Sequence, residues 1–418
     1  MTKINTRDLT PQEWLLVGLA NALDQDGLTY LKRLAYAKLI VIHLALDGTR
    51  AEMLDSIHKV LTNYSRNDVD YSAAFSAMLA IYDVHNTGET KYKVALDSIN
   101  SGAQIQSALT RCETGMKATG LINTGKRPDV YTDILNACGA ASISRVQCKA
   151  ATVPSLYGSI AMPKAIFGDD VDAYTDACHA IIPGAMWLRD ILMDVHQEDP
   201  ERIEYKVVAP DRFTAHLQTV NILNVDVVAR GVEHRIGLKR LGIDESYRAL
   251  AANVIHFVDG FIARELTTRL NYDPDQLNEA AYAIEHHLKQ GSSVNHRTVL
   301  EFESLFVKFG FLSSAVLPYI KLGHLKGVSK KMLHAMLERI KVTEYHPPVI
   351  TDDIFDSFSS HPNDCTRTRD CYCEVLNDLY RSNWLTVTLH DLTGEDYTLR
   401  EVSEKVSREI LTAVYPIT

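Results

Sequence analysis

The sequence predicts an α+β protein that is predominantly helical and contains a small antiparallel sheet. Apolar residues recur at helical spacing through most of the chain, whereas strand-like runs are short and few. The 418 residues are 46% hydrophobic and 23% charged, a composition typical of a globular protein with ample length for a large core. No apolar run reaches the roughly 18 residues that a membrane span requires, so we expect none.

The first half of the chain is expected to be helical apart from one buried strand. Thr10-Pro11 predicts a helix start, because proline suits the first helical position. The apolar run Val94-Ala95-Leu96 predicts a strand that leads into Asp97. Pro154 should end or kink the helix that contains it. Helices are expected within 8–90, from Gln104 to Thr110, and over 128–138, 141–153 and 170–196.

The second half adds a hairpin, more helices and a late strand. Tyr205–Ala209 and Leu217–Ala229 favour two strands joined through the turn at Pro210. Helices are expected over 244–270, 274–345 and 395–415, and 346–370 is interpreted as irregular. The run Trp384–Leu389 predicts a strand that ends just before His390-Asp391. The sheet would then contain both Asp97 and Asp391.

Charge and cysteine content limit the possible functions only weakly. The formal net charge is −10, so any contact with nucleic acid requires a locally basic surface. The first residues lack the apolar segment of a signal peptide, and the seven cysteines favour a reducing compartment over a disulfide framework. Cys365, Cys371 and Cys373 are close together without a CxxC pair, which favours packing, with a zinc site as the alternative.

Two short motifs and one later carboxylate have the chemistry of nucleotidyl transfer. The first motif is Asp97-Ser98-Ile-Asn-Ser101-Gly102-Ala-Gln104, and the second is Arg145-x3-Lys149-x7-Tyr157-Gly158. A carboxylate at a strand end can hold a divalent metal ion, and Asp391 would supply a second one. Arg145 and Lys149 lie four residues apart, so they share a helix face and can bind a polyphosphate.

Each of these residues also has a purely structural interpretation. An Asp at a strand end can cap a turn, and a pair of cations on a helix is often a solvated face. Tyr157 can be a core tyrosine, and the same holds for Tyr131 and His256. Asp259 is the alternative to Asp391 as second metal ligand, although its helical context is less suitable.

Taken in order, the motifs resemble those of the single-subunit, phage-type RNA polymerases. The Asp97 segment resembles their motif A, Arg145–Gly158 their motif B with the same spacing, and His390-Asp391 their motif C. Three further segments are similar to family segments: Pro128-Asp-Val-Tyr131, Ala209-Pro-Asp-Arg-Phe213 and Asn253-Val-Ile-His256-x2-Asp259-Gly260. The resemblance covers roughly residues 10–270 and 380–418.

This resemblance implies a right-hand polymerase fold and DNA-directed RNA synthesis. Asp97, Asp391 and the Ser98 carbonyl would hold two Mg²⁺ ions, and Lys149 would donate a proton to the leaving pyrophosphate. Tyr157 would sense the sugar of the nucleoside triphosphate. The residues implied for the remaining substrate contacts are Arg145, Tyr131, His256 and Gly158. Those implied for nucleic-acid contacts are Arg230, Arg235, Lys239 and Arg240, for which a solvated basic face is the alternative.

The resemblance also divides the chain and exposes departures from the family. The implied regions are 1–110 (N-terminal helices and palm with motif A), 111–200 (fingers with motif B), 201–272 (hairpin and palm-side helix), 273–378 (an insertion atypical of the family) and 379–418 (palm motif C and C-terminal helix). No Thr/Asp-x-x-Gly-Arg motif is found, and no clear counterpart of the family's palm lysine occurs near Gln25. The N-terminal domain and thumb are therefore expected to be missing.

These departures imply a second polymerase subunit that carries the missing motif. The chain is most similar to the larger, catalytic subunit of the heterodimeric family members from Enquatrovirus-type phages, which would act in the cytoplasm of the infected bacterial host. DNA template, RNA product and nucleoside triphosphates are the other expected partners, together with a possible recruiting factor. Alternatives are a palm-type DNA polymerase or primase and a non-catalytic scaffold. The basic segment Lys321–Lys341 is expected to contact either nucleic acid or the partner.

Overall fold

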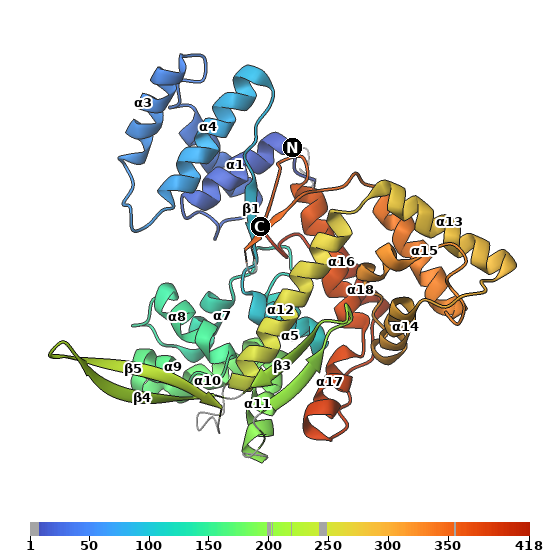
Figure 1. The fold of residues 1–418 in the computed structure, drawn as a ribbon. Helices are drawn as coiled ribbons and strands as arrows, with labels where there is room; N and C mark the ends of the chain where they lie inside the picture. The colour runs from blue at the N-terminus through green and yellow to red at the C-terminus, as the bar shows by residue number, and fades with distance from the viewer. Residues whose placement is uncertain (1–7, 199–201, 203, 219, 242–248, 355–356) are drawn as a thin grey trace.

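The computed structural model describes residues 8–198, 202, 204–218, 220–241, 249–354 and 357–418 (Figure 1). It is mostly helical with small antiparallel sheets, which confirms the predicted α+β class. A three-stranded sheet has the order β1-β7-β6, formed by Val94–Asp97, Ser357–Ser360 and Asp352–Ile354. Two further sheets are hairpins, β2-β3 and β4-β5.

Four helices precede β1. Together with Tyr92, just before the strand, they form a separate core. Their bounds are α1 Pro11–Ala22, α2 Tyr30–Val41, α3 Arg50–Leu61 and α4 Tyr71–Thr87. Thr10 caps α1 as its sequence indicates, because its hydroxyl accepts from the Glu13 N–H while Glu13 accepts from the Thr10 N–H. Leu19, Met53 and Met78 are fully buried in the core between these helices.

The helices after β1 form a second core around α7, α8 and α10. The elements are α5 Ser101–Leu109, α6 Glu113–Ala118, α7 Val130–Cys138, α8 Arg145–Leu156, α9 Ala161–Phe167, η1 Gly168–Asp170, α10 Val171–Ile181 and α11 Pro183–Glu198. Pro154 is expected to end or kink its helix; the helix does not end there, since α8 continues to Leu156. Proline at this position removes one intrahelical donor, and the helix ends two residues later.

The predicted hairpin is correct at its first strand and incomplete at its second. β2 (Glu204–Val208) pairs with β3 (Thr214–Gln218), but a further strand, β4 (Val220–Ala229), begins two residues after β3 ends. β4 pairs with β5 (Val232–Leu241) through Arg230 and Gly231, both of which have positive φ. A two-residue turn of this kind matches the twist of the flanking strands. Figure 1 shows this second hairpin projecting from the body of the protein.

A long helix, α12 (Ala249–Leu270), and α16 (Cys365–Arg381) pack together at the largest core. α17 (Trp384–Thr393) and α18 (Glu404–Leu411) complete this part of the chain. Cys365, Cys371 and Cys373 are buried thiols on α16, and burial raises the pKa of Cys371 to about 12. Neutral buried thiols fit packing, and no described group of three or more metal-ligating side chains includes them.

The predicted strand Trp384–Leu389 is wrong, because these residues form the first part of helix α17. The buried positions on α17 recur with helical period: Trp384, Leu385, Thr388, Leu389 and Leu392. The prediction of an irregular 346–370 is also wrong in part, because β6, β7 and the start of α16 lie there. The sheet that holds Asp97 is therefore completed by β7 and β6 rather than by residues 384–389.

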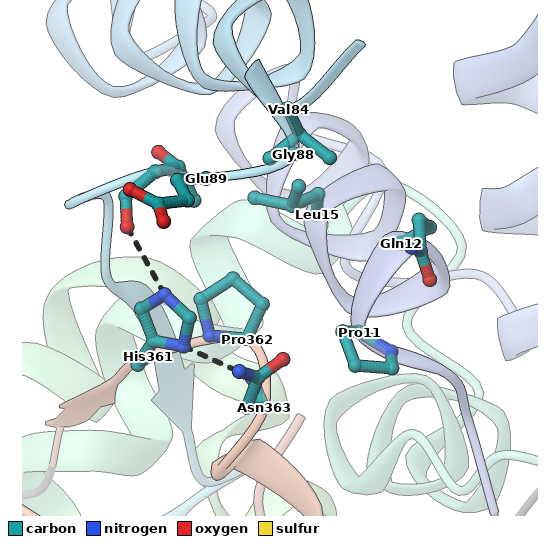
Figure 2. A pocket seen from close by; sticks show the side chains of 10 residues that line it. Pro11, Gln12, Leu15, Val84, Gly88, Glu89, His361, Pro362 and Asn363 are labelled. Atoms are coloured by element: carbon teal, nitrogen blue, oxygen red, sulfur yellow. Dashed lines mark hydrogen bonds between the residues drawn. The ribbon is translucent and has the colours of Figure 1, made fainter.

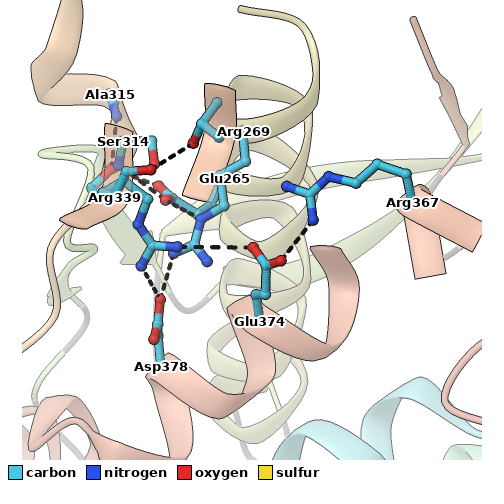
Figure 3. A network of polar contacts seen from close by, with 10 residues as sticks. Glu265, Arg269, Ser314, Ala315, Arg339, Arg367, Glu374 and Asp378 are labelled. Atoms are coloured by element: carbon cyan, nitrogen blue, oxygen red, sulfur yellow. Dashed lines mark hydrogen bonds and ion pairs between the residues drawn. The ribbon is translucent and has the colours of Figure 1, made fainter. Parts of the chain in front are cut away.

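Residues 273–345 form a helical subdomain with its own core, shown together on one side of Figure 1. Its elements are α13 Pro274–Gln290, α14 Arg297–Phe309, η2 Ser314–Tyr319 and α15 Lys330–Glu344. A buried polar network joins it to α12 and α16 (Figure 3). Arg269 donates to Glu265 at 2.8 Å and to Asp378 at 2.8 Å, and Arg339 of α15 also pairs with Asp378.

Candidate functional site

Asp97 ends β1 on the exposed face of the sheet, where its backbone is fixed on both sides. Along one side it pairs with Ser357 of β7. Along the other, the Thr418 N–H donates to the Asp97 carbonyl at 2.8 Å, and the Asp97 N–H donates to the Thr418 carbonyl at 3.3 Å. The Asp97 carboxylate also accepts from the Ser98 N–H at 2.9 Å. The predicted strand-end carboxylate is thus present, and its position is set by paired backbone.

After Asp97 the chain turns into α5, and the side chain of Asn100 at this turn contacts Tyr131 of α7. Asn100 caps α5 by accepting from the Ala103 N–H at 2.9 Å, and its amide donates to the Tyr131 hydroxyl at 3.1 Å. Tyr131 is 2% exposed. Burial raises the pKa of Tyr131 to about 12, against the opposing effect of the Asn100 hydrogen bond, and the charge of Asp97 adds to the increase. Tyr131 therefore lies within electrostatic reach of Asp97 and stays neutral.

Arg145 and Lys149 both lie above the Tyr131 ring. Ser144 caps α8 through a capping box, which starts the helix at Arg145 and sets both cations on one face. The Arg145 guanidinium carbon is 5.4 Å from the centroid of the Tyr131 ring, and the Lys149 Nζ is 6.0 Å from it. Both distances fall within the range of cation–π attraction. The two predicted phosphate-binding cations therefore converge on the same ring.

Asp129 orients Arg145. The Arg145 Nε is 2.6 Å from the Asp129 carboxylate, and the Arg145 side chain remains 41% exposed. Burial alone would raise the pKa of Asp129, but the hydrogen bonds from Arg145 and Thr132 outweigh it and hold the pKa below its usual value. The charge of Asp129 raises the pKa of Arg145 in turn. This carboxylate, whose role was not predicted, keeps part of the guanidinium available to a ligand.

Tyr157 is the C-cap residue of α8, and its ring packs at a tilt against the ring of His256 of α12. The two ring centroids are 4.9 Å apart with an interplanar angle of 41°. A Cβ added at Gly102 would lie 2.9 Å from the Tyr157 hydroxyl, so glycine is needed for this close approach. Gly158, directly after Tyr157, has φ +88° and is buried. The second motif therefore meets the first at Gly102.

Asp391 does not join this group. It lies in the last turn of α17, and its carboxylate is 2.8 Å from the Nζ of Lys308 on α14. Figure 1 shows α17 well apart from β1, and a separation seen in projection is a lower limit on the separation in space. The expected convergence of Asp97 and Asp391 at neighbouring strand ends is therefore corrected. Asp259, the alternative, lies in α12 one turn beyond His256.

The predicted nucleic-acid residues lie on the β4–β5 hairpin. Arg230 occupies its turn, and Arg235 forms an exposed ion pair with Asp226 at 2.9 Å. Lys239 and Arg240 belong to β5, but their side chains lie outside the part of the structure that is described. Val228 and Val232 near the turn are 67% and 57% exposed. The hairpin surface is thus mixed rather than uniformly basic.

A pocket of about 300 Å³ lies away from these residues, between α1, the end of α4 and the loop after β7 (Figure 2). His361 lines it and its Nε2 is 3.1 Å from the Thr90 carbonyl. None of the predicted site residues lines this pocket. Within the described ranges, no three or more His, Cys, Asp or Glu side chains are grouped closely enough to hold a metal ion.

Comparison with known proteins adds no identification. No protein-family model matches the chain, and a search of curated proteins found no match. In the described part of the chain, no helix is both long and apolar enough to cross a membrane. Any assignment of function therefore depends on the motifs and on the geometry around Asp97.

Proposed function

We propose that the chain is the catalytic subunit of a DNA-directed RNA polymerase, which adds ribonucleotides to an RNA 3′-OH on a DNA template. The observation that supports this most is the grouping of Asp97, the Arg145–Lys149 pair and the Tyr157–His256 pair around Tyr131 and Gly102. A strand-end carboxylate, two cations and a ring pair are the groups that a nucleoside triphosphate requires. They come from β1, α8 and α12, which are distant in sequence.

Each side chain has a definite task in this proposal. Arg145 offers its guanidinium fork to the triphosphate, held by Asp129. Lys149 is a compact charge one helical turn away and can transfer a proton to the departing pyrophosphate. The Tyr157 ring, which packs against His256, would lie under the incoming base, and its hydroxyl would contact the sugar. Gly158 leaves space for the template base.

The donor set near Asp97 fits magnesium only in part. Mg²⁺ commonly binds through one or two carboxylates plus substrate phosphates and water, so a large protein cage is not required. Asp97 and the Ser98 carbonyl are suitable hard oxygen ligands. Two bound ions would activate the 3′-OH and stabilise the pyrophosphate. Asp391 is not positioned to complete this set, because it pairs with Lys308 on another part of the protein.

The second carboxylate is better sought beside β7. Ser357, which opens β7, is the residue that pairs with Asp97. In the sequence, Ser357 is preceded by Asp356, which lies outside the described residues. We infer that Asp356 is the second acidic ligand, on its sequence adjacency to the partner of Asp97. Asp352 of β6 lies on the same face of the sheet, two positions further along, but its carboxylate is engaged at 2.7 Å by Lys93.

A second polymerase subunit belongs to the same proposal. Three large apolar side chains of α2 and its C-terminal end face solvent, with Leu31 47%, Leu39 62% and Ile42 71% exposed. Exposed apolar groups that gather on one element favour a protein interface. The chain alone should therefore support little run-off transcription, and a co-purified second subunit should restore it. Full activity of the chain by itself would contradict this part of the proposal.

The decisive experiment is nucleotide addition to an RNA primer on a pre-melted DNA template, with ribonucleotides or deoxynucleotides. We expect addition of ribonucleotides, and Asp97→Asn should remove it while template binding persists. Tyr157→Phe should lower the preference for ribonucleotides about tenfold, the value of one lost hydrogen bond. A preference for deoxynucleotides in the unaltered chain would identify a DNA polymerase instead. No addition by the reconstituted complex would identify a scaffold.

A further inference from the structure

The helical subdomain 273–345 has a local charge that contrasts with that of the whole chain. The chain is acidic overall, yet no Asp or Glu occurs between Glu303 and Glu338. Lysines are spread over that interval: Lys308, Lys321, Lys326, Lys330 and Lys331. Most of them follow η2, in the loop that leads to α15 and in the first turn of α15. This part of the surface is therefore locally positive.

The lysines of the loop form no ion pair with a described carboxylate. Lys308 pairs with Asp391, and Lys341 pairs with Glu338. In contrast, Lys321, Lys326 and Lys330 are exposed, and within the described ranges none of them forms an ion pair. α15 has no acidic residue in its first turn, although the Glu303 carboxylate accepts from the N–H of its N-cap residue Ser329 at 3.3 Å.

Aromatic rings lie beside these lysines. Tyr282 of α13 is 61% exposed and Tyr319 at the end of η2 is 39% exposed. A pocket of about 570 Å³ is lined by Tyr282 and Lys321, together with Gln276, Glu279, Pro318, Ile320 and Leu322. Its wall is mainly apolar and includes one cation and one carboxylate. A hollow of this size can accept an unpaired base.

Backbone hydrogen bonds hold the loop that carries the lysines. The Val294 N–H donates to the Gly323 carbonyl at 3.2 Å, and the Lys326 N–H donates to the Val294 carbonyl at 3.0 Å. The His296 ring lies between Tyr319 and His324, with centroid distances of 6.0 and 6.5 Å. The loop therefore has a defined path, with Lys321 and Lys326 on either side of His324.

We propose that this surface, formed by Tyr282, Tyr319, Lys321, Lys326 and Lys330, binds single-stranded nucleic acid outside the catalytic site. Lysines would contact successive phosphates while unpaired bases stack on the tyrosines. Bases in a duplex are already stacked and cannot enter the pocket, so single strands are favoured. The proposal goes beyond the polymerase assignment, because it requires neither Asp97 nor any catalysis.

The test measures binding of labelled oligo(dT) and oligo(rU) by the full chain over a range of salt concentrations. We expect the triple variant Lys321→Ala, Lys326→Ala, Lys330→Ala to bind about tenfold more weakly. The slope of log affinity against log salt should fall by about 2, since each lost single-strand phosphate contact contributes about 0.7. The matched control replaces three exposed lysines of α2 and α3, Lys32, Lys38 and Lys59, and should bind as the unaltered chain does.

A second variant separates stacking from charge. Tyr282→Ala should weaken binding about tenfold with an unchanged salt slope, whereas Tyr282→Phe should retain it. Equal losses in the lysine variant and the control would overturn the proposal, as would equally lysine-dependent binding of duplex DNA. Nucleotide addition on a short pre-annealed scaffold provides the separate readout. If addition is absent but lysine-dependent binding persists, the polymerase assignment fails and this inference stands.

Discussion

The surroundings of Asp97 and of Asp391 differ, although the sequence predicts the same role for both. Asp97 ends a strand whose backbone is paired on both sides, and the cations of α8 lie nearby around Tyr131. Asp391 ends a helix, and its carboxylate is engaged by Lys308 from the helical subdomain. The same residue type after a similar apolar run can therefore belong to the proposed catalytic group or to a surface ion pair.

The difference shows why a short motif needs its structural context. The run before Asp97 alternates between buried and exposed positions, as a strand with one covered face does. The run before Asp391 is rich in Thr, Val and Leu, but Leu385, Leu389 and Leu392 are buried at helical spacing. Strand propensity is weak evidence when a helical stripe is also present, because burial of that stripe determines the outcome.

The largest expected effect separates the two carboxylates directly. Asp97→Asn should lower nucleotide addition about a thousandfold, since a metal ligand supplies several kcal/mol of transition-state stabilisation. Asp391→Asn should leave addition within about twofold, because its loss removes only a surface ion pair. Single-turnover primer extension measures both. A large loss with Asp391→Asn and none with Asp97→Asn would reverse the comparison.

The next substitution tests the residue that replaces Asp391 in the proposal. Asp356→Asn should match Asp97→Asn in its loss of addition, because both carboxylates would hold the same ions. Asp352→Asn is the matched control on β6 and should lose far less, since Lys93 already occupies its carboxylate. Rates measured with increasing Mg²⁺ provide a second readout. An unaffected Asp356→Asn enzyme would exclude this residue as a ligand.

A smaller effect is expected from the cation beside Tyr131. Lys149→Ala should slow addition about a hundredfold, the lower limit for loss of a positioned proton donor. The loss should shrink for substrates whose leaving group needs less protonation. The matched control is Lys308→Ala, which removes the ion-pair partner of Asp391 and should not alter the rate of addition. Equal losses in the two variants would show that only general surface charge matters.

The smallest effects concern stability. Asp129→Asn should destabilise the fold by about 1–2 kcal/mol, because the carboxylate accepts charge-assisted hydrogen bonds in a partly buried position. Since the pKa of Asp129 is lowered by folding, its contribution is complete above about pH 4 and is lost as the pH falls further. Denaturant titrations at pH 7 and pH 3 should show a smaller difference between variant and parent at the lower pH, because pH 3 lies below the unfolded-state pKa of an Asp. A difference of the same size at both pH values would contradict the ionic explanation.

Much of the Asp97 site could be predicted from sequence, because its motifs specify local structure. The helix that carries Arg145 and Lys149 is expected over 141–153 and runs from Arg145 to Leu156, and Val94–Leu96 is a strand as predicted. The partners β6 and β7 could not be predicted, since they are short and rich in Asp and Ser, and their pairing with β1 is long-range. Asp129 was missed as a positioning residue because its contact with Arg145 depends on how α7 and α8 pack.

The buried network of Figure 3 couples two parts of the protein that are distant in space. α12 carries His256 in its first half and the fully buried Glu265–Arg269 pair toward its other end, about 14–20 Å away at 1.5 Å per residue. Breaking such a pair by removing one partner costs about 3–5 kcal/mol, so Arg269, Asp378 and Arg339 hold α12, α16 and α15 together. A displacement of the helical subdomain would therefore move α12 and with it His256, whose ring packs against Tyr157.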